Sequence, residues 1–210
     1  MKSLGILLAG ALGLMASGAA AGSPTFLFND FGPGQSYYNY GTLVEPTYPT
    51  IDSFVSWNSG NLTQIDIAIQ TFDTVGGAKS VTVSLWTDMG DLPGSELGSW
   101  DLSNLPIDSA QTSGDITTIA GISGISLTAG NQYWLKVASS VGDAAWSINS
   151  QEVFGQTIFS DGNAYPTIIG AFDALSSGVP EPGTWMMLIF GIGMTGYAAR
   201  KRRQANAISA

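Results

Sequence analysis

The sequence predicts an all-β protein, an antiparallel β-sandwich of jelly-roll type flanked by an N-terminal signal helix and a C-terminal transmembrane helix. Apolar and polar residues alternate in short runs, and clusters of Gly, Pro, Asn and Asp separate these runs. Each end of the chain instead carries an apolar run beside basic residues. About nine or ten short strands at such spacing are typical of a sandwich, so we expect one domain between the two ends.

The N-terminal residues 1–21 have the pattern of a cleaved secretory signal. A lysine at position 2 precedes an uncharged apolar run, and small residues stand at Ala19 and Ala21, immediately before Gly22. We expect signal peptidase to cleave there after export through the Sec translocon, so that the mature chain begins near Gly22.

Residues 22–178 form the predicted sandwich domain. It begins with an irregular lead-in that contains one short strand at 35–43, and regular alternation starts at Ile51. The clearest strands, each expected to turn one aliphatic face inward, are 65–70, 81–86 and 133–138. Shorter candidates, bounded by turn residues, are 97–102, 116–119, 123–127, 145–149, 157–160 and 167–172.

The mature segment is strongly acidic. The whole chain has a formal net charge of −9, but between residues 22 and 179 fifteen acidic residues face two basic ones. Such a field repels phosphate backbones, so we expect no nucleic-acid partner. The chain has no Cys and no His, which excludes disulfides, zinc or haem sites built on those residues, and Ser-His-Asp or Cys-His nucleophiles.

Catalysis would have to rely on carboxylates, hydroxyls, tyrosines and two lysines. A glycosidase can work with two carboxylates, yet nothing in the sequence singles out one pair among fifteen acids. We therefore expect a non-enzymatic protein without catalytic residues.

The C-terminal tail, residues 179–203, has three parts. The triplet Pro180, Glu181 and Pro182 comes first, and an uncharged apolar stretch, 184–199, follows it. As a transmembrane helix this stretch would span roughly 24 Å, against a hydrocarbon core of roughly 30 Å. A basic cluster then stops transfer into the membrane, because moving it through costs on the order of 10 kcal/mol. This cluster consists of Arg200, Lys201, Arg202 and Arg203.

This order of parts resembles the PEP-CTERM sorting signal of Gram-negative bacteria. The resemblance implies that an exosortase of the inner membrane recognises the tail and cleaves near the Pro-Glu-Pro triplet. It also implies an inner-membrane-anchored precursor and a destination at the cell surface or in the extracellular matrix, with the exopolysaccharide of a biofilm as a partner. Residues 204–210 are then a cytoplasmic tail. The alternative is a permanently anchored protein that is never cleaved.

A second resemblance covers about residues 54–150. The short motifs that carry it are Ser53-Phe54, 65–69, 83–88, 92–97, 127–135 and Ala145-Trp146. Their order is similar to the choice-of-anchor type R domain, which occurs in exported bacterial proteins with alternative surface-sorting tails. This family supplies no catalytic residues.

Carbohydrate binding is the alternative function. Trp57 and Trp86 stand where strands end or meet loops, so their rings are candidate contacts for a sugar face. If the strand faces opposite the aliphatic residues are exposed, Trp86 and Trp134 form a binding patch. The competing interpretation is that both strand faces are buried or that a loop covers the rings.

Calcium is a candidate cofactor of such a module. Asp88 and Asp91 lie three residues apart in a Gly-containing turn, and Asp161 precedes a glycine in another turn. Calcium prefers carboxylate and carbonyl oxygens as ligands. The competing interpretation is that both segments are ordinary acidic hairpin turns, in which Gly and Pro set the backbone geometry.

Overall fold

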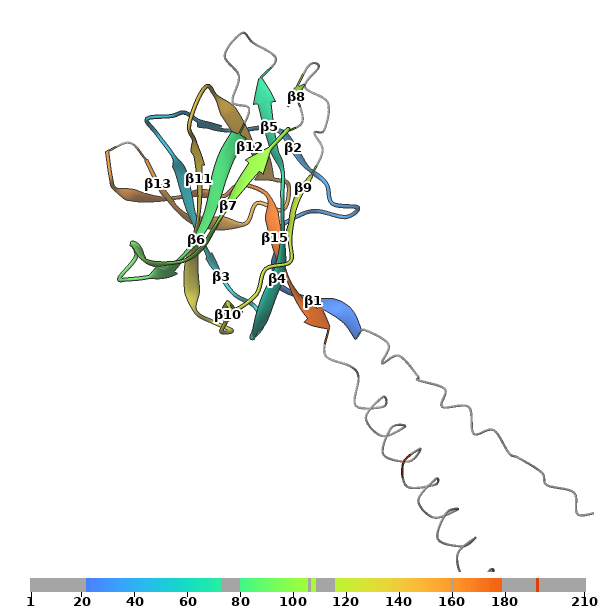
Figure 1. Ribbon diagram of the computed structural model, residues 1–210. Coiled ribbons are helices and arrows are strands. Elements are labelled where there is room, and N and C mark those ends of the chain that lie inside the picture. The colour runs from blue at the N-terminus through green and yellow to red at the C-terminus, as the bar shows by residue number, and fades with distance from the viewer. Residues whose placement is uncertain are drawn as a thin grey trace, which may run out of the picture. The chain divides into compact units, whose positions relative to one another are not determined.

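The computed structural model describes residues 22–72, 80–105, 107–108, 116–159, 161–178 and 192 (Figure 1). The all-β prediction is confirmed for the compact unit Ser23–Gly178, whose described residues form strands, turns and loops. The predicted signal helix and, apart from Ile192, the predicted helix over 184–199 lie outside the described residues. Within the described part of the chain, no helix is both long enough and apolar enough to span a bilayer.

The described strands form three sheets. The first contains β1 (Gly22–Asn29), β15 (Phe172–Gly178), β4 (Gly60–Ile67) and β10 (Ser126–Leu127) in that order, with β9 (Thr117–Ala120) also paired to β4. The second has the order β14 (Ala164–Ile168), β13 (Phe154–Ile158), β3 (Thr50–Val55), β11 (Gln132–Ser139), β6 (Ser80–Asp88) and β7 (Pro93–Ser103). The third has the order β2 (Tyr37–Val44), β12 (Ala144–Asn149), β5 (Ile69–Phe72) and β8 (Ile107–Asp108). Apart from the parallel pair β5–β8, the described registers are antiparallel.

One hydrophobic core joins the three sheets. Phe28 of β1 and Phe172 of β15 have ring centroids 4.7 Å apart, and both rings lie within about 5 Å of Phe54 on β3. The fully buried Trp146 of β12 contacts the same cluster, with its ring centroid 6.0 Å from that of Phe172. Tilted and edge-on aromatic contacts of this kind add specific geometry to the burial of apolar area.

The segment 65–70 differs from the prediction of one strand with one inward face. The structure divides it at Ala68 into β4, which pairs with β15, and β5, which pairs with β12. Ala68 N–H donates to the carbonyl of Ala171, and the Ala68 carbonyl accepts from Ser147 N–H, so the chain passes from one sheet to another at this residue. Both faces are buried, including Asp66 and Gln70, because each sheet is covered on both sides here.

Other strand boundaries also differ from the prediction. The expected strand at 157–160 lies earlier, as β13, and the expected strand at 167–172 is replaced by the end of β14 and the start of β15. Gly170 lies between them at a close approach, where a Cβ would come within 2.2 Å of the Trp146 indole. The strand β1 was not expected, since its proline and small residues are poor strand formers away from a sheet edge.

Candidate functional site

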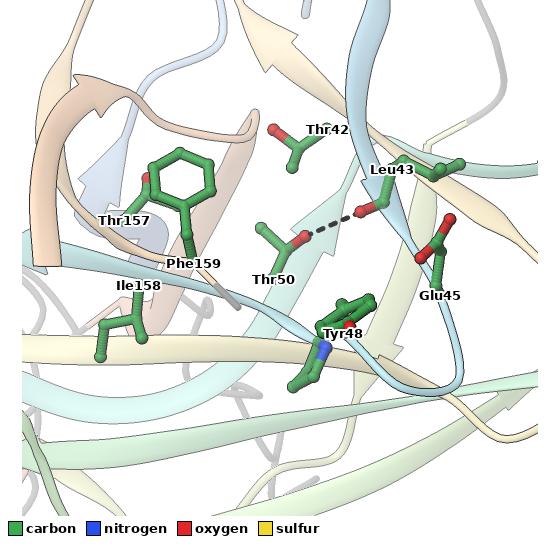
Figure 2. Close-up of a pocket in the computed structure, with 9 residues that line it drawn as sticks. Thr42, Leu43, Glu45, Tyr48, Thr50, Thr157, Ile158 and Phe159 are labelled. Carbon is green, nitrogen blue, oxygen red and sulfur yellow. Dashed lines mark hydrogen bonds between the residues drawn. The ribbon is translucent and has the colours of Figure 1, made fainter. Parts of the chain in front are cut away.

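A pocket of about 210 Å³ lies where the connection from β2 to β3 meets the end of β13 (Figure 2). Its lining combines hydroxyl groups, a carboxylate and aromatic rings on a small surface. The lining residues are Thr42, Leu43, Glu45, Tyr48, Pro49, Thr50, Thr157, Ile158 and Phe159.

A tight turn places Glu45 and Tyr48 together at this pocket. Glu45 N–H donates to the Tyr48 carbonyl at 3.2 Å, and Tyr48 N–H donates to the Glu45 carbonyl at 3.1 Å. Residues that face each other directly in such a pair project their side chains from the same side. Pro46 restricts the backbone at the first central position of the turn, where its fixed φ is favourable. The turn therefore presents a carboxylate and an aromatic ring side by side.

Two buried threonines lie beneath these side chains. Thr50 and Thr157 are each 3% exposed. Thr50 Oγ1 donates to the Leu43 carbonyl at 3.4 Å, which is the bond drawn in Figure 2. Thr157 Oγ1 donates to Asp52 Oδ1, and Asp52 Oδ2 accepts from Gly170 N–H at 2.9 Å. The wall that β13 provides is therefore held by hydrogen bonds to a buried carboxyl group, and burial raises the pKa of Asp52 to about 6.

The turn after β13 positions the second aromatic ring. Phe159 N–H donates to the Asn163 carbonyl at 3.3 Å, and the Phe159 carbonyl accepts from Gly162 N–H at 2.9 Å. The Phe159 ring lies 5.8 Å from that of Tyr165, centroid to centroid, and is 45% exposed. Tyr48, which is 51% exposed, lies on the other side of Thr50 (Figure 2). Two accessible rings thus flank a polar floor.

Trp86 and Trp134 do not form an exposed patch. Trp134 and Trp86 are direct partners in the β11–β6 ladder, but Trp134 is fully buried and its indole N–H donates to Asp88 Oδ1 at 2.8 Å. Trp86 is partly buried, with its indole N–H donating to Ser84 Oγ and the Lys136 ammonium 5.9 Å from its ring centroid. The strand face that carries Trp134 is therefore covered, as the competing interpretation expects.

Trp57 remains accessible. It is 53% exposed, and its ring lies 5.4 Å from that of Phe28, centroid to centroid. Neither Trp57 nor Trp86 is among the residues that line the pocket. Their assignment as glycan contacts stays a prediction.

The turn with Asp88 and Asp91 is held by N–H donors. Asp88 Oδ2 accepts from the backbone of Gly90 and Asp91, while Oδ1 accepts from Gln132 and Trp134. Desolvation raises the pKa of Asp88, but these hydrogen bonds, that of Trp134 foremost, outweigh it and hold the pKa below its usual value. Asp91 has a positive φ of 63°, as this turn requires.

Asp161 lies in the separate turn between β13 and β14. Its Oδ1 accepts from Asn163 N–H at 3.0 Å, and its Oδ2 accepts from the Asn163 amide and from the Tyr165 hydroxyl. These hydrogen bonds lower the pKa of Asp161. Among the described residues, no group of three or more acidic side chains is arranged to hold a metal ion. Calcium binding at these turns stays the alternative to the interpretation as ordinary acidic hairpin turns.

Sequence reasoning missed a set of buried acids. Asp66 and Asp173 are direct partners in the β4–β15 ladder, and they are 6% and 2% exposed. Asp66 accepts hydrogen bonds from Gln64 and Thr118, whereas Asp173 Oδ1 has no hydrogen-bond partner among the described residues. Burial, followed by the charge of Asp66, raises the pKa of Asp173 to about 7. When apolar and acidic residues alternate along a strand, the acidic ones are ordinarily assigned to the solvent-exposed face. The sequence therefore gave no indication that Asp66 and Asp173 are buried.

Asp30 is a further buried acid of this kind. It is fully buried, and its Oδ1 accepts from Phe172 N–H at 2.7 Å. Burial raises its pKa well above the usual value, and the charge of Asp52 adds to the effect. Asp30, Asp66 and Asp173 are thus buried, and none of them is among the residues that line the pocket.

The tail matches a known family model. Residues 178–203 match the PEP-CTERM protein-sorting motif. The match begins at the last residue of β15 and includes the Pro-Glu-Pro triplet, the apolar stretch and the basic cluster. A comparison with curated proteins finds no matching relative. The chain therefore carries a tail similar to the PEP-CTERM sorting motif, and this tail implies an exported precursor that an exosortase processes and sorts to the cell surface.

Proposed function

We propose that this protein is a non-enzymatic component of the cell surface or extracellular matrix that an exosortase releases from its membrane-anchored precursor. The observation that carries the proposal is the sorting-motif match over 178–203, which begins where the last strand of the β-unit ends. Cleavage at a signal in this position would leave all strands of the β-unit in the N-terminal product.

The proposed route assigns one task to each part of the two ends. The signal over 1–21 directs export, and cleavage between Ala21 and Gly22 frees the N-terminus. The apolar stretch 184–199 then holds the chain in the inner membrane, and the basic cluster fixes its orientation. Prolines at 180 and 182 disfavour a helix by their sequence alone, and we expect the triplet, which lies outside the described residues, to be accessible to a peptidase-like active site.

The β-unit is proposed to be a jelly-roll sandwich of the choice-of-anchor type R kind. Its continuous aromatic and aliphatic core supports a fold that is stable outside the cell without disulfides. Its excess of acidic residues favours solubility and association with matrix polymers through bridging cations.

The absence of catalysis is part of the proposal. Glu45 is the one carboxylate among the residues that line the pocket, whereas hydrolysis by carboxylates alone uses two. The acids with raised pKa values, Asp30, Asp52 and Asp173, are at most 2% exposed and cannot contact a substrate directly.

Replacing Pro180, Glu181 and Pro182 with alanine tests the sorting step. In the native host, the variant precursor is expected to accumulate in the membrane fraction while the parent protein leaves it. A matched variant with Gln204, Asn206 and Ser209 replaced by alanine, beyond the basic cluster, controls for changes to the tail in general. Unchanged processing of the triplet variant would refute its role.

Saccharide binding is a second candidate function, and the pocket between the Glu45–Tyr48 turn and Phe159 favours it. Flat exposed rings beside hydroxyl and carboxylate groups match the two surfaces of a sugar, whose C–H face is apolar and whose edge carries hydroxyl groups.

A further inference from the structure

We propose that the pocket formed by Glu45, Tyr48, Thr50 and Phe159 binds one sugar residue of a neutral or amino-sugar polysaccharide. The inference rests on the second candidate function, saccharide binding, and assigns to it a site and a ligand class. It places the site away from the tryptophans that the sequence suggested.

The aromatic rings provide the apolar half of the recognition. Tyr48 and Phe159 are 51% and 45% exposed, and they lie on either side of the pocket floor (Figure 2). Hydrogen-bonded turns hold the backbone of both residues, and the Phe159 ring also contacts the ring of Tyr165. A backbone that is already held in place loses less conformational entropy when a sugar face packs on the rings.

The polar groups provide the other half. Glu45 shares the turn with Tyr48, so its carboxylate can accept hydrogen bonds from hydroxyl groups at the edge of a ring that stacks on the tyrosine. Thr50 lies at the floor, where its Oγ1 donates to the Leu43 carbonyl, and its 3% exposure leaves the polar contacts with a ligand to Glu45 at the rim. The rim therefore presents a carboxylate acceptor to a ligand rich in hydroxyl donors.

The charge of the lining selects the class of sugar. Glu45 is the one charged side chain among the lining residues, and Lys136 lies elsewhere, over the Trp86 ring of the neighbouring strand. A uronate carboxylate would lie beside Glu45 without a cation, and such a like-charge contact disfavours binding. A neutral hydroxyl or the ammonium group of an amino sugar has no such penalty.

The size of the pocket limits what it encloses. Its volume of about 210 Å³ is smaller than the roughly 300–1,000 Å³ that is typical of sites enclosing drug-sized ligands. It fits a single sugar ring, and the neighbouring residues of a polysaccharide would continue over the surface.

The test measures binding of the full-length chain to an array of neutral, amino-sugar and uronate hexasaccharides. The chain is kept in a zwitterionic detergent that carries no sugar group. The parent is expected to bind neutral or amino-sugar oligomers and not uronates. Tyr48→Ala and Phe159→Ala are each expected to weaken the best parent ligand about tenfold. Tyr48→Phe keeps the aromatic ring and should bind as the parent does. It therefore still tests the role of the ring if Tyr48→Ala fails to fold.

Two further variants separate the possible sites. Glu45→Gln is expected to reduce the preference for amino sugars and to admit uronates, because it removes the charge and keeps the shape. Trp57→Ala tests the rival contact that the sequence suggested, an exposed ring outside the lining, and a loss of binding confined to this variant would move the site there. Each variant is checked for its fold by circular dichroism.

The outcomes are distinguishable. Binding that the pocket variants leave unchanged, or that only Trp57→Ala abolishes, overturns this site and leaves saccharide binding in place. Selective binding of uronates overturns the ligand class. No binding on the whole array overturns both the site and the second candidate function, while the export proposal stands on its own measurement.

Discussion

Asp66 and Asp173 face each other directly across the β4–β15 ladder, and both are buried. Two ionised carboxylates in register repel each other, and burial further disfavours the charged form. These effects, burial first, raise the pKa of Asp173 to about 7, and burial raises the pKa of Asp52 to about 6. The folded protein therefore retains protons on these side chains at a pH where the unfolded chain has lost them.

The free energy of unfolding is predicted to decrease as the pH rises from about 4 to about 7. Asp52 and Asp173 have an ordinary pKa of 3.8 and raised values of about 6 and about 7 when folded. Their stabilising contribution is fully present below the ordinary value and is lost as the pH passes the raised values. Urea unfolding of the full-length chain in detergent, at several pH values across this window, measures the effect.

Asp173→Asn provides the matched test of this pH dependence. The substitution keeps the shape and removes the charge, so it should stabilise the protein at about pH 8 by on the order of 2 kcal/mol and flatten the profile. Asp143→Asn, at an exposed position, should leave the profile unchanged. A parent whose stability is constant or rises from about pH 4 to about pH 7 would contradict the assignment.

Gly170→Ala is predicted to destabilise the fold by about 3 kcal/mol, as overpacking of a filled core does. A Cβ at this position would lie 2.2 Å from the indole of Trp146, which is fully buried. Gly124→Ala is the control: its φ is +78°, but no atom lies within 4 Å of the added Cβ, so its cost should be about 1 kcal/mol. Equal melting temperatures for the two variants would show that the close approach at Gly170 is not a constraint.

Calcium is predicted to leave the melting temperature of the parent unchanged. The carboxylate of Asp88 already accepts hydrogen bonds from Gly90, Asp91, Gln132 and Trp134, and a cation would have to replace those donors. Asp88→Asn should destabilise the protein by about 1–2 kcal/mol with or without calcium, because the charged acceptor is lost. Thermal unfolding in millimolar calcium and in chelator is the measurement. A calcium-dependent increase in the parent that disappears in Asp88→Asn would establish the site that the sequence suggested.

The sequence predicted best the bounds of those strands whose aliphatic residues all lie on one face. The segments 81–86 and 133–138 lie within β6 and β11, since their aliphatic residues all face the core, although Ser84 and Trp134 on the other side are buried as well. Across 65–70 the same alternation continues while the chain changes sheets at Ala68. A period of two shows which side chains are buried, but the backbone partners are set by segments distant in sequence, here Ala171 and Ser147.

The candidate pocket could not be predicted for a related reason. Tyr48 follows and Phe159 precedes ordinary turn residues, and the pairing of β13 with β3 brings their segments together. The buried pair of Asp66 and Asp173 likewise depends on register between distant strands. The sorting tail, by contrast, is a contiguous motif, so its recognition needs no tertiary structure.

Intact-mass analysis of the protein from the membranes and the culture supernatant of its native host tests the central claim most directly. The proposal predicts a supernatant or matrix species that begins near Gly22 and ends near Pro180 to Pro182, and any added mass would identify an attached group. A protein found only in membranes, with its C-terminus intact through Ala210, would contradict processing by an exosortase and make the tail a permanent anchor.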